Sequence, residues 1–208
     1  MENKNKSTLI KDALILFVIT LIAGLGLGLV NEVTKDPIAD ANAEAKQEAY
    51  QSVFADAAEF VEDKSITEKV ENSEDFLSEN DLSGAEITEA LIANDESGTP
   101  IGYVISFTAK EGYGGDITLS MGMLNDGTIT GLEVLSASET AGLGAKCTEA
   151  EFKDQFQGIN ADNVEYTKDG ATADNQIDAI SGATITTKAV TKGVNAAIAF
   201  LKQDVMQG

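Results

Sequence analysis

A threonine hydroxyl at the end of a turn of small residues is the feature of this sequence best suited to covalent chemistry. The stretch DAISGAT occupies residues 178–184 and ends on Thr184. Gly182 and Ala183 leave room beside that hydroxyl for a bulky phosphate donor and for unusual backbone angles. The stretch therefore has room for a phosphate-bearing group beside the hydroxyl. The alternative is a tight turn that joins a strand to a helix and has no chemical role.

A helix is expected directly after this stretch. Apolar residues recur there at helical spacing from Val190 to Leu201, and Thr186 or Thr187 is placed to cap the helix. Thr184 would then lie just ahead of a helix N-terminus. Free N–H groups and the positive end of the helix dipole favour a phosphate at such a position.

The composition excludes several other kinds of chemistry. The chain has no His and no Trp, its single Cys is Cys147, and all 14 basic residues are Lys. A Ser-His-Asp triad, a His-ligated zinc and a Cys-His nucleophile are therefore excluded, and one thiol cannot hold an iron–sulfur cluster or form an internal disulfide. The net charge of −21 argues against nucleic-acid binding, because phosphates would be repelled. The composition therefore leaves two possibilities: the chain uses chemistry supplied by an organic cofactor, or it performs no chemistry.

An uncharged apolar run predicts one transmembrane helix at residues 13–30, which as a helix would cover about 27 Å of bilayer. Lysines precede the run and acidic residues dominate after it. The positive-inside rule then places residues 1–12 in the cytoplasm and the larger domain outside the cytoplasmic membrane. A cleaved signal peptide is the alternative, but no small-residue cleavage site follows closely. Gly24 and Gly28 form a G-x-x-x-G pair that would let a partner helix approach.

The chain beyond the apolar run divides into two regions by composition. Residues 31–86 are expected to form a juxtamembrane helix and then an acidic surface segment. Residues 87–208 are expected to form one domain, and alternating apolar residues predict strands within it at 101–107, 117–123 and 128–135. A helix capped by Thr148 and the C-terminal helix follow these strands. This order predicts an α+β domain built on an antiparallel sheet with flanking helices.

Two glycine-rich stretches, GYGG at residues 112–115 and ETAGLGAK at 139–146, interrupt these elements. In order, GYGG, a strand, an Asp-Gly turn, a strand, ETAGLGAK and DAISGAT resemble the FMN-binding domain that two membrane-complex subunits share. These are RnfG of the Rnf ferredoxin:NAD+ oxidoreductases and NqrC of the sodium-pumping NADH:quinone oxidoreductases. The resemblance covers residues 100–204, and the short region before it is more similar to RnfG. It implies FMN joined covalently to Thr184 through its phosphate by a separate flavin transferase.

Further site residues follow from the same resemblance, at positions that match the family's motifs. The implied cofactor-binding residues beside Thr184 are Asp178, Ser181, Gly182 and Ala183, and the implied loop that lines the flavin contains Glu139, Thr140, Gly142, Leu143 and Gly144. Ala141 replaces the family's usual proline. Ala137 stands where the family often has histidine, so no role of that histidine is carried over. Lys146 is added from the residues themselves, because it is the cation nearest these motifs and suits an anionic flavin or phosphate. No metal site and no catalytic side chain are expected.

The resemblance implies an electron-transfer subunit in which FMN, rather than the protein, accepts and donates electrons. The expected complex couples ferredoxin:NAD+ electron transfer to Na+ or H+ translocation, with RnfD and neighbouring membrane subunits as partners. One alternative is an NqrC-like subunit, and another is a free-standing membrane-anchored flavoprotein that passes electrons to external acceptors. A third is a binding or scaffold domain without redox chemistry.

Overall fold

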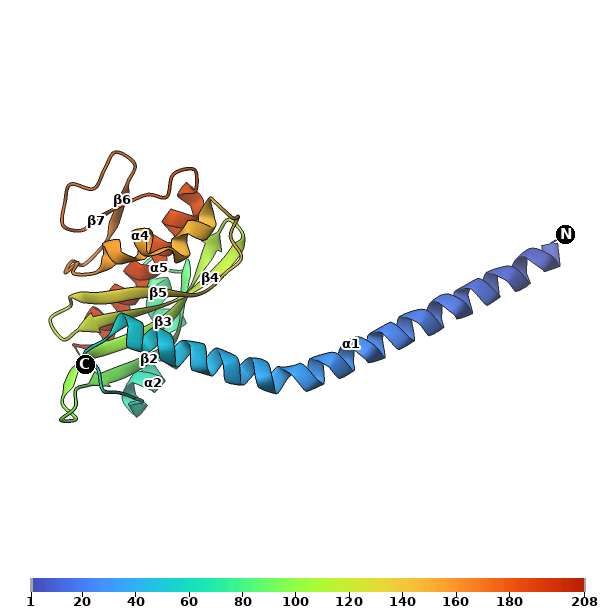
Figure 1. Ribbon diagram of the computed structural model, residues 1–208, viewed down its shortest axis with the longest axis horizontal. Helices are drawn as coiled ribbons and strands as arrows, with labels where there is room; N and C mark the ends of the chain where they lie inside the picture. The colour runs from blue at the N-terminus through green and yellow to red at the C-terminus, as the bar shows by residue number, and fades with distance from the viewer. Residues whose placement is uncertain (1, 208) are drawn as a thin grey trace. The chain divides into compact units, whose positions relative to one another are not determined.

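The computed structural model describes residues 2–207, with side chains from Lys11 onward except at positions 39, 40 and 42. The chain forms two compact units, Met1–Ala45 and Lys46–Gly208. The described residues of the first unit all lie within the long helix α1 (Glu2–Val53; Figure 1), and Pro37 lies inside this helix. Within the described residues, α1 contains one stretch long and apolar enough to cross a membrane, and its large apolar side chains from Leu14 to Val33 are exposed.

The second unit is built on a five-stranded antiparallel sheet in which each strand pairs with its neighbour in sequence. The strands are β1 (Glu59–Val61), β2 (Ala85–Asn94), β3 (Pro100–Gly112), β4 (Gly115–Leu124) and β5 (Ile129–Ala137). Gly127 closes the β4–β5 hairpin at φ +88°, a left-handed conformation that glycine adopts without strain. The predicted antiparallel sheet with flanking helices is confirmed.

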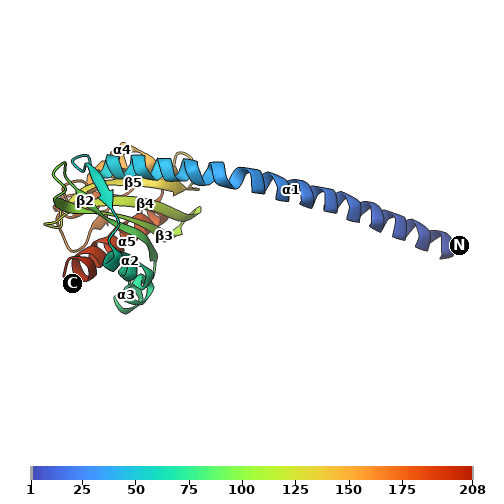
Figure 2. The ribbon, with the colours of Figure 1, turned by 90° about the horizontal axis from the view of Figure 1, so that it is seen from below.

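The remaining elements are short apart from one C-terminal helix. They are α2 (Lys64–Glu71), α3 (Ser73–Glu79), η1 (Gly144–Thr148), α4 (Ala150–Lys153), η2 (Asp154–Phe156), the parallel pair β6 (Glu165–Thr167) and β7 (Gln176–Asp178), α5 (Thr184–Ala199) and η3 (Phe200–Val205). Helix α5 packs on β2, β3 and β4 and covers one face of the sheet (Figure 2). The Phe107 ring lies against Gly193, where a Cβ would come within 2.9 Å of it, so the helix sits close to β3.

The opposite face of the sheet receives the C-terminal end of α1 (Figure 2). Val53 and Phe54 are fully buried there, over a row of glycines on three adjacent strands. This glycine seat consists of Gly102, Gly122 and Gly131. A Cβ on Gly122 would lie 2.5 Å from the Val53 carbonyl oxygen, and one on Gly102 would lie 2.7 Å from the Phe54 ring. Only glycine lets the helix end come this close.

Residues 46–86 belong to the same compact unit as the sheet, although the sequence analysis placed them before the domain. Strand β1 pairs with β2 at the sheet edge, and α2 and α3 pack on β2. Ile66 and Leu77 are buried in the main core. The carboxylates of this segment point mostly to solvent, which explains why its composition is typical of a surface segment.

Candidate functional site

A cavity of about 440 Å³ lies where the N-terminus of α5 meets the two glycine-rich loops. Its walls come from the β3–β4 turn, the loop that follows β5, and the first residues of α5. The residues that line it are Tyr113, Glu139, Thr140, Leu143, Gly144, Gly182, Ala183, Thr184, Ile185 and Thr186. The three motifs that the sequence analysis singled out therefore meet at one place.

Thr184 is the first residue of α5 and is half-buried. The helix begins earlier than expected, so Thr186 and Thr187 do not cap it. Both residues are buried inside the first turn, and the N-cap position falls on Ala183. The amides of residues 184–186 have no acceptor inside the helix, as at any helix N-terminus. Thr184 thus carries its hydroxyl at the positive end of the α5 dipole.

The threonines of α5 differ in how their hydroxyls are used. Thr186 donates to Glu139 Oε2 at 2.9 Å, and Thr191 donates to the Thr187 carbonyl at 2.8 Å. The Thr187 hydroxyl donates to the Ala183 carbonyl and accepts the Ile180 N–H, both at 3.0 Å. In the described part of the chain, the Thr184 hydroxyl has no such partner. It is the one threonine hydroxyl of α5 that remains available to an incoming group.

Glu139 ties together the three segments that surround the cavity. Its Oε1 accepts the Gly114 N–H at 3.1 Å, and its Oε2 accepts the Thr186 hydroxyl. A Cβ on Gly144 would lie 2.2 Å from Oε2, and a Cβ on Gly114 would lie 2.1 Å from the Ser138 carbonyl oxygen. These glycines are required by close approach, so the loops form a fixed wall.

Gly182 carries the turn that leads into α5. Its φ of +77° is the left-handed conformation that favours glycine. A Cβ there would lie 3.0 Å from Leu143 Cδ2, so the Leu143 side chain packs against the turn. The turn thereby brings the DAISGAT and ETAGLGAK motifs into contact.

Three of the residues proposed from the sequence lie in a different hollow. Lys146, Asp178 and Ser181 line a neighbouring depression of about 410 Å³, and Gly142 lines neither space. The Asp178 carboxylate accepts the Ala171 N–H at 2.6 Å, which gives it a structural role in its loop. Lys146 is exposed and forms no ion pair with the residues that the structure describes. Within the DAISGAT motif, the residues up to Ser181 therefore face one hollow, and the residues from Gly182 onward line the cavity.

Tyr113, Ile185 and Thr186 line the cavity although the sequence analysis did not propose them. Tyr113 lies inside the GYGG stretch, and an aromatic residue between glycines was a usable signal. Ile185 and Thr186 follow Thr184 directly. They were missed because the helix was expected to begin after them.

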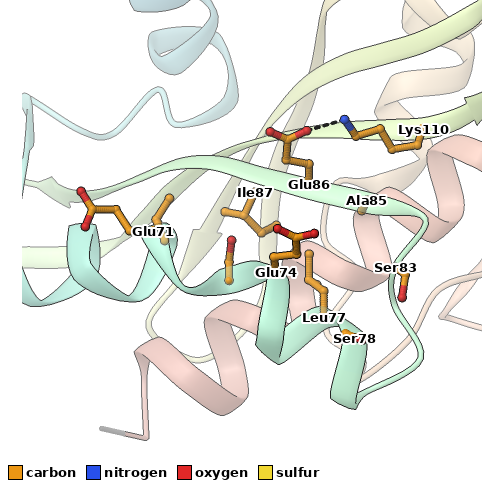
Figure 3. A pocket seen from close by; sticks show the side chains of 11 residues that line it. Glu71, Glu74, Leu77, Ser78, Ser83, Ala85, Glu86, Ile87 and Lys110 are labelled. Atoms are coloured by element: carbon orange, nitrogen blue, oxygen red, sulfur yellow. Dashed lines mark ion pairs between the residues drawn. The ribbon is translucent and has the colours of Figure 1, made fainter.

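A further hollow of about 430 Å³ lies between α2, α3 and β2 (Figure 3). Glu71, Glu74 and Glu86 line it together with Lys110, and the Lys110 ammonium pairs with Glu86. Carboxylates therefore outnumber cations in this hollow. Such a site repels a phosphate, so it is not a candidate for binding a phosphorylated cofactor.

Two family models match the chain, the FMN-binding domain at residues 112–199 and the RnfG N-terminal region at residues 1–53. The chain is 35% identical over 205 residues to the G subunit of the Na+-translocating ferredoxin:NAD+ oxidoreductase complex of Acetobacterium woodii, covering 95% of this chain and 96% of that protein. It is 34% identical over 185 residues to the G subunit of the ion-translocating oxidoreductase complex of Methanosarcina acetivorans, covering 88% and 89%.

A crystal structure of NqrC from Shewanella oneidensis is similar with a TM-score of 0.46 and 23% identity, over 52% of this chain and 54% of that one. The family membership follows from the sequence relatives. Those relatives extend over nearly the whole chain and are named as G subunits of redox complexes. The chain therefore belongs to the RnfG family, the G subunits of the ion-translocating ferredoxin:NAD+ oxidoreductase complexes, and it contains an FMN-binding domain.

Proposed function

We propose that this chain is an electron carrier of an Rnf-type complex and that FMN is joined to Thr184 through a phosphoester. The observation that carries the proposal is that Thr184, the first residue of α5, lines the 440 Å³ cavity and that its hydroxyl has no hydrogen-bond partner among the described residues. The neighbouring threonine hydroxyls are committed to protein atoms. Thr184 is thus the threonine of α5 best placed to react.

The surroundings of Thr184 suit a flavin phosphate. Helix α5 is 16 residues long and carries no acidic residue in its first turn, so its dipole and free amides stabilise an anion there. The cavity volume falls within the range of about 300–1,000 Å³ that is usual for cofactor sites. Leu143 and Ile185 add apolar surface to its walls. Phosphate and flavin ring would both find matching chemistry.

The esterification itself needs groups that the chain does not supply at this position. A bond forms between Thr184 Oγ1 and the flavin phosphorus while the phosphoanhydride bond of an activated flavin nucleotide breaks. The hydroxyl proton passes to a base, and the other phosphate-bearing fragment of the donor leaves. The carboxylate that lines the cavity, Glu139, already accepts hydrogen bonds from Gly114 and Thr186. It is therefore poorly placed to act as the base. We assign the base and the activated donor to a separate flavin transferase.

The residues around Thr184 would then serve to hold the cofactor. Thr184 tethers the phosphate, Gly182 and Ala183 leave space for it, and Glu139 fixes the walls. The bound FMN supplies the electron acceptance and donation, as organic cofactors generally do. Attachment by a covalent bond prevents loss of the flavin in a compartment where little free FMN exists to replace it.

We place the flavin domain outside the cytoplasmic membrane, with α1 as its anchor and residues 1–12 in the cytoplasm. The exposed apolar side chains of α1 and the lysines that precede them support this orientation. Other membrane subunits, RnfD among them, would exchange electrons with the flavin. Relatives are named both as Na+-translocating and as proton-translocating, so a subunit of this family is compatible with either coupling ion.

The test is the intact mass of the chain produced in membranes of a host that contains a flavin transferase. Wild type and Ser181→Ala are expected to gain the mass of one flavin phosphate, and Thr184→Ala is expected to lack it. Ser181 is the matched control because it is the exposed hydroxyl of the same turn. Thr184→Ser retains a hydroxyl and should keep some modification. A flavin on Thr184→Ala, or an unmodified wild type beside a modified related protein, would refute the proposal.

A further inference from the structure

Three exposed apolar side chains gather at the mouth of the cavity beside Thr184. Tyr113, Leu143 and Ile185 are 70%, 43% and 54% exposed. Among residues 46–207 as the structure describes them, no other large apolar side chain is exposed to this degree, and all three line the same cavity. Single exposed apolar residues are ordinary, but a cluster around one cavity marks a surface that a ligand covers.

The exposure of Tyr113 is not the result of a slack loop. Gly112 pairs with Gly115 across the β3–β4 turn, and a Cβ on Gly112 would lie 2.2 Å from the Gly115 carbonyl oxygen. On the other side of Tyr113, the Gly114 N–H is held by Glu139. The backbone is therefore fixed on both sides of a ring that the protein itself leaves uncovered.

The neighbouring hollow around Lys146 provides fewer favourable contacts for a flat apolar ring. It is lined by the acidic residues Glu149, Glu151 and Asp178. Its one aromatic residue, Phe152, is buried with 3% exposure and packs edge-on against Phe156, so it presents no open ring face. An aromatic ligand gains more from the side of the turn that holds Tyr113.

We propose that Tyr113 stacks on the isoalloxazine ring of FMN, with Leu143 and Ile185 as apolar contacts, so that the ring lies in this cavity and not in the hollow of Lys146. The inference rests on the proposed tether at Thr184 and adds the position of the ring to it. Tyr113 acts as a positioning residue for the flavin. A phenol stacked on the ring also has a spectroscopic consequence.

A phenol in contact with an excited flavin donates one electron to it and regains that electron, which quenches fluorescence without net chemistry. The chain has no Trp and four Tyr, and Tyr113 is the one that lines the cavity. The fluorescence yield per bound flavin is therefore expected to rise several-fold in both Tyr113→Leu and Tyr113→Phe. The measurement uses full-length modified chain in detergent micelles, and absorbance gives the flavin content.

Two matched variants complete the experiment. Tyr166→Phe removes a tyrosine that lines none of the three hollows, and Lys146→Ala alters the neighbouring hollow. Both are expected to keep the wild-type yield. Unchanged fluorescence in the Tyr113 variants, or a spectral change in Lys146→Ala alone, would overturn the ring position while leaving the tether intact. The tether itself fails only by the mass test on Thr184, so the two failures are distinguishable. Lower modification of a variant does not affect the result, because the yield is taken per bound flavin.

Discussion

Replacing Gly122 with alanine tests whether the C-terminal end of α1 packs tightly on the sheet of the FMN-binding domain. Gly122 lies on β4 in the glycine seat, paired directly with Gly131 on β5. A Cβ at Gly122 would lie 2.2 Å from Thr130 Oγ1 and 2.5 Å from the Val53 carbonyl oxygen. The Thr130 side chain can rotate, but the Val53 oxygen belongs to the helix backbone. The helix end must therefore shift.

The structure sets bounds on the cost of this shift. Complete undocking would expose Val53 and Phe54, which are 2% and 1% exposed. At about 1.5–3 kcal/mol for each side chain, that would cost roughly 3–6 kcal/mol. A small displacement with overpacking costs about 1–3 kcal/mol. The small displacement costs less than undocking, so it is the expected response. Gly122→Ala should therefore lower the free energy of unfolding by about 2 kcal/mol, which lowers the melting temperature by roughly 4–8 °C for a domain of this size.

Scanning calorimetry of the full-length, unmodified chain in detergent micelles measures this loss. Two other glycines give a graded series. A Cβ on Gly131 would lie 3.0 Å from Val53 Cα, a tight contact, whereas one on Gly84 meets its nearest atom, Lys192 Cδ, at 3.6 Å. The loss should therefore decrease from Gly122→Ala to Gly131→Ala, and Gly84→Ala should change stability by no more than about 0.5 kcal/mol. If Gly122→Ala were as stable as Gly84→Ala, the claim that the end of α1 packs tightly on the glycine seat would be refuted.

Three further predictions concern other parts of the chain. Glu139→Ala leaves the buried Thr186 hydroxyl without its acceptor, whereas the exposed Gly114 N–H can bond to water. We expect a loss of about 1–3 kcal/mol in the free energy of unfolding by urea, and a smaller loss for Glu139→Gln. Equal stability of Glu139→Ala and wild type would contradict the structural role of Glu139. Burial, aided by the nearby Glu139 carboxylate, raises the pKa of the Cys147 thiol to about 11, so a thiol reagent at pH 8 should label the folded chain far more slowly than the urea-unfolded one. The folded thiol keeps its proton where an unfolded thiol, with a pKa near 9.0, has lost it, so this thiol's contribution to stability falls as pH rises from 9 to 11. Gly24→Leu combined with Gly28→Leu should reduce co-purification of other membrane subunits, and unchanged recovery would remove the helix-packing hypothesis.

The sequence predicted best those elements whose signal is local. Alternating apolar residues mark β3, β4 and β5, and the helical spacing from Val190 to Leu201 marks α5. The expected caps were wrong because cap positions depend on burial. Thr187 is turned inward and holds Ile180, and Thr148 donates to the Ala145 carbonyl within η1 without capping α4.

Features that arise from pairing between distant segments could not be predicted in the same way. The glycine seat joins residues 102, 122 and 131, whose relation appears only when the strand register is known. Strand β1 is three residues long and is defined by its pairing with β2. The division of the expected site has a similar origin, because the Gly182 turn sends Ser181 toward one hollow and Thr184 toward the other.

Within the compact unit Lys46–Gly208, strand β3 connects the C-terminal end of α1 to the cavity. Gly102, near its start, lies under Phe54 at the end of α1, and Phe107 packs against α5 on the opposite face. The strand then ends at Gly112, one residue before Tyr113. Because a paired strand in the middle of a sheet is among the stiffest elements of a fold, the cavity is held at a fixed distance from residues 46–54.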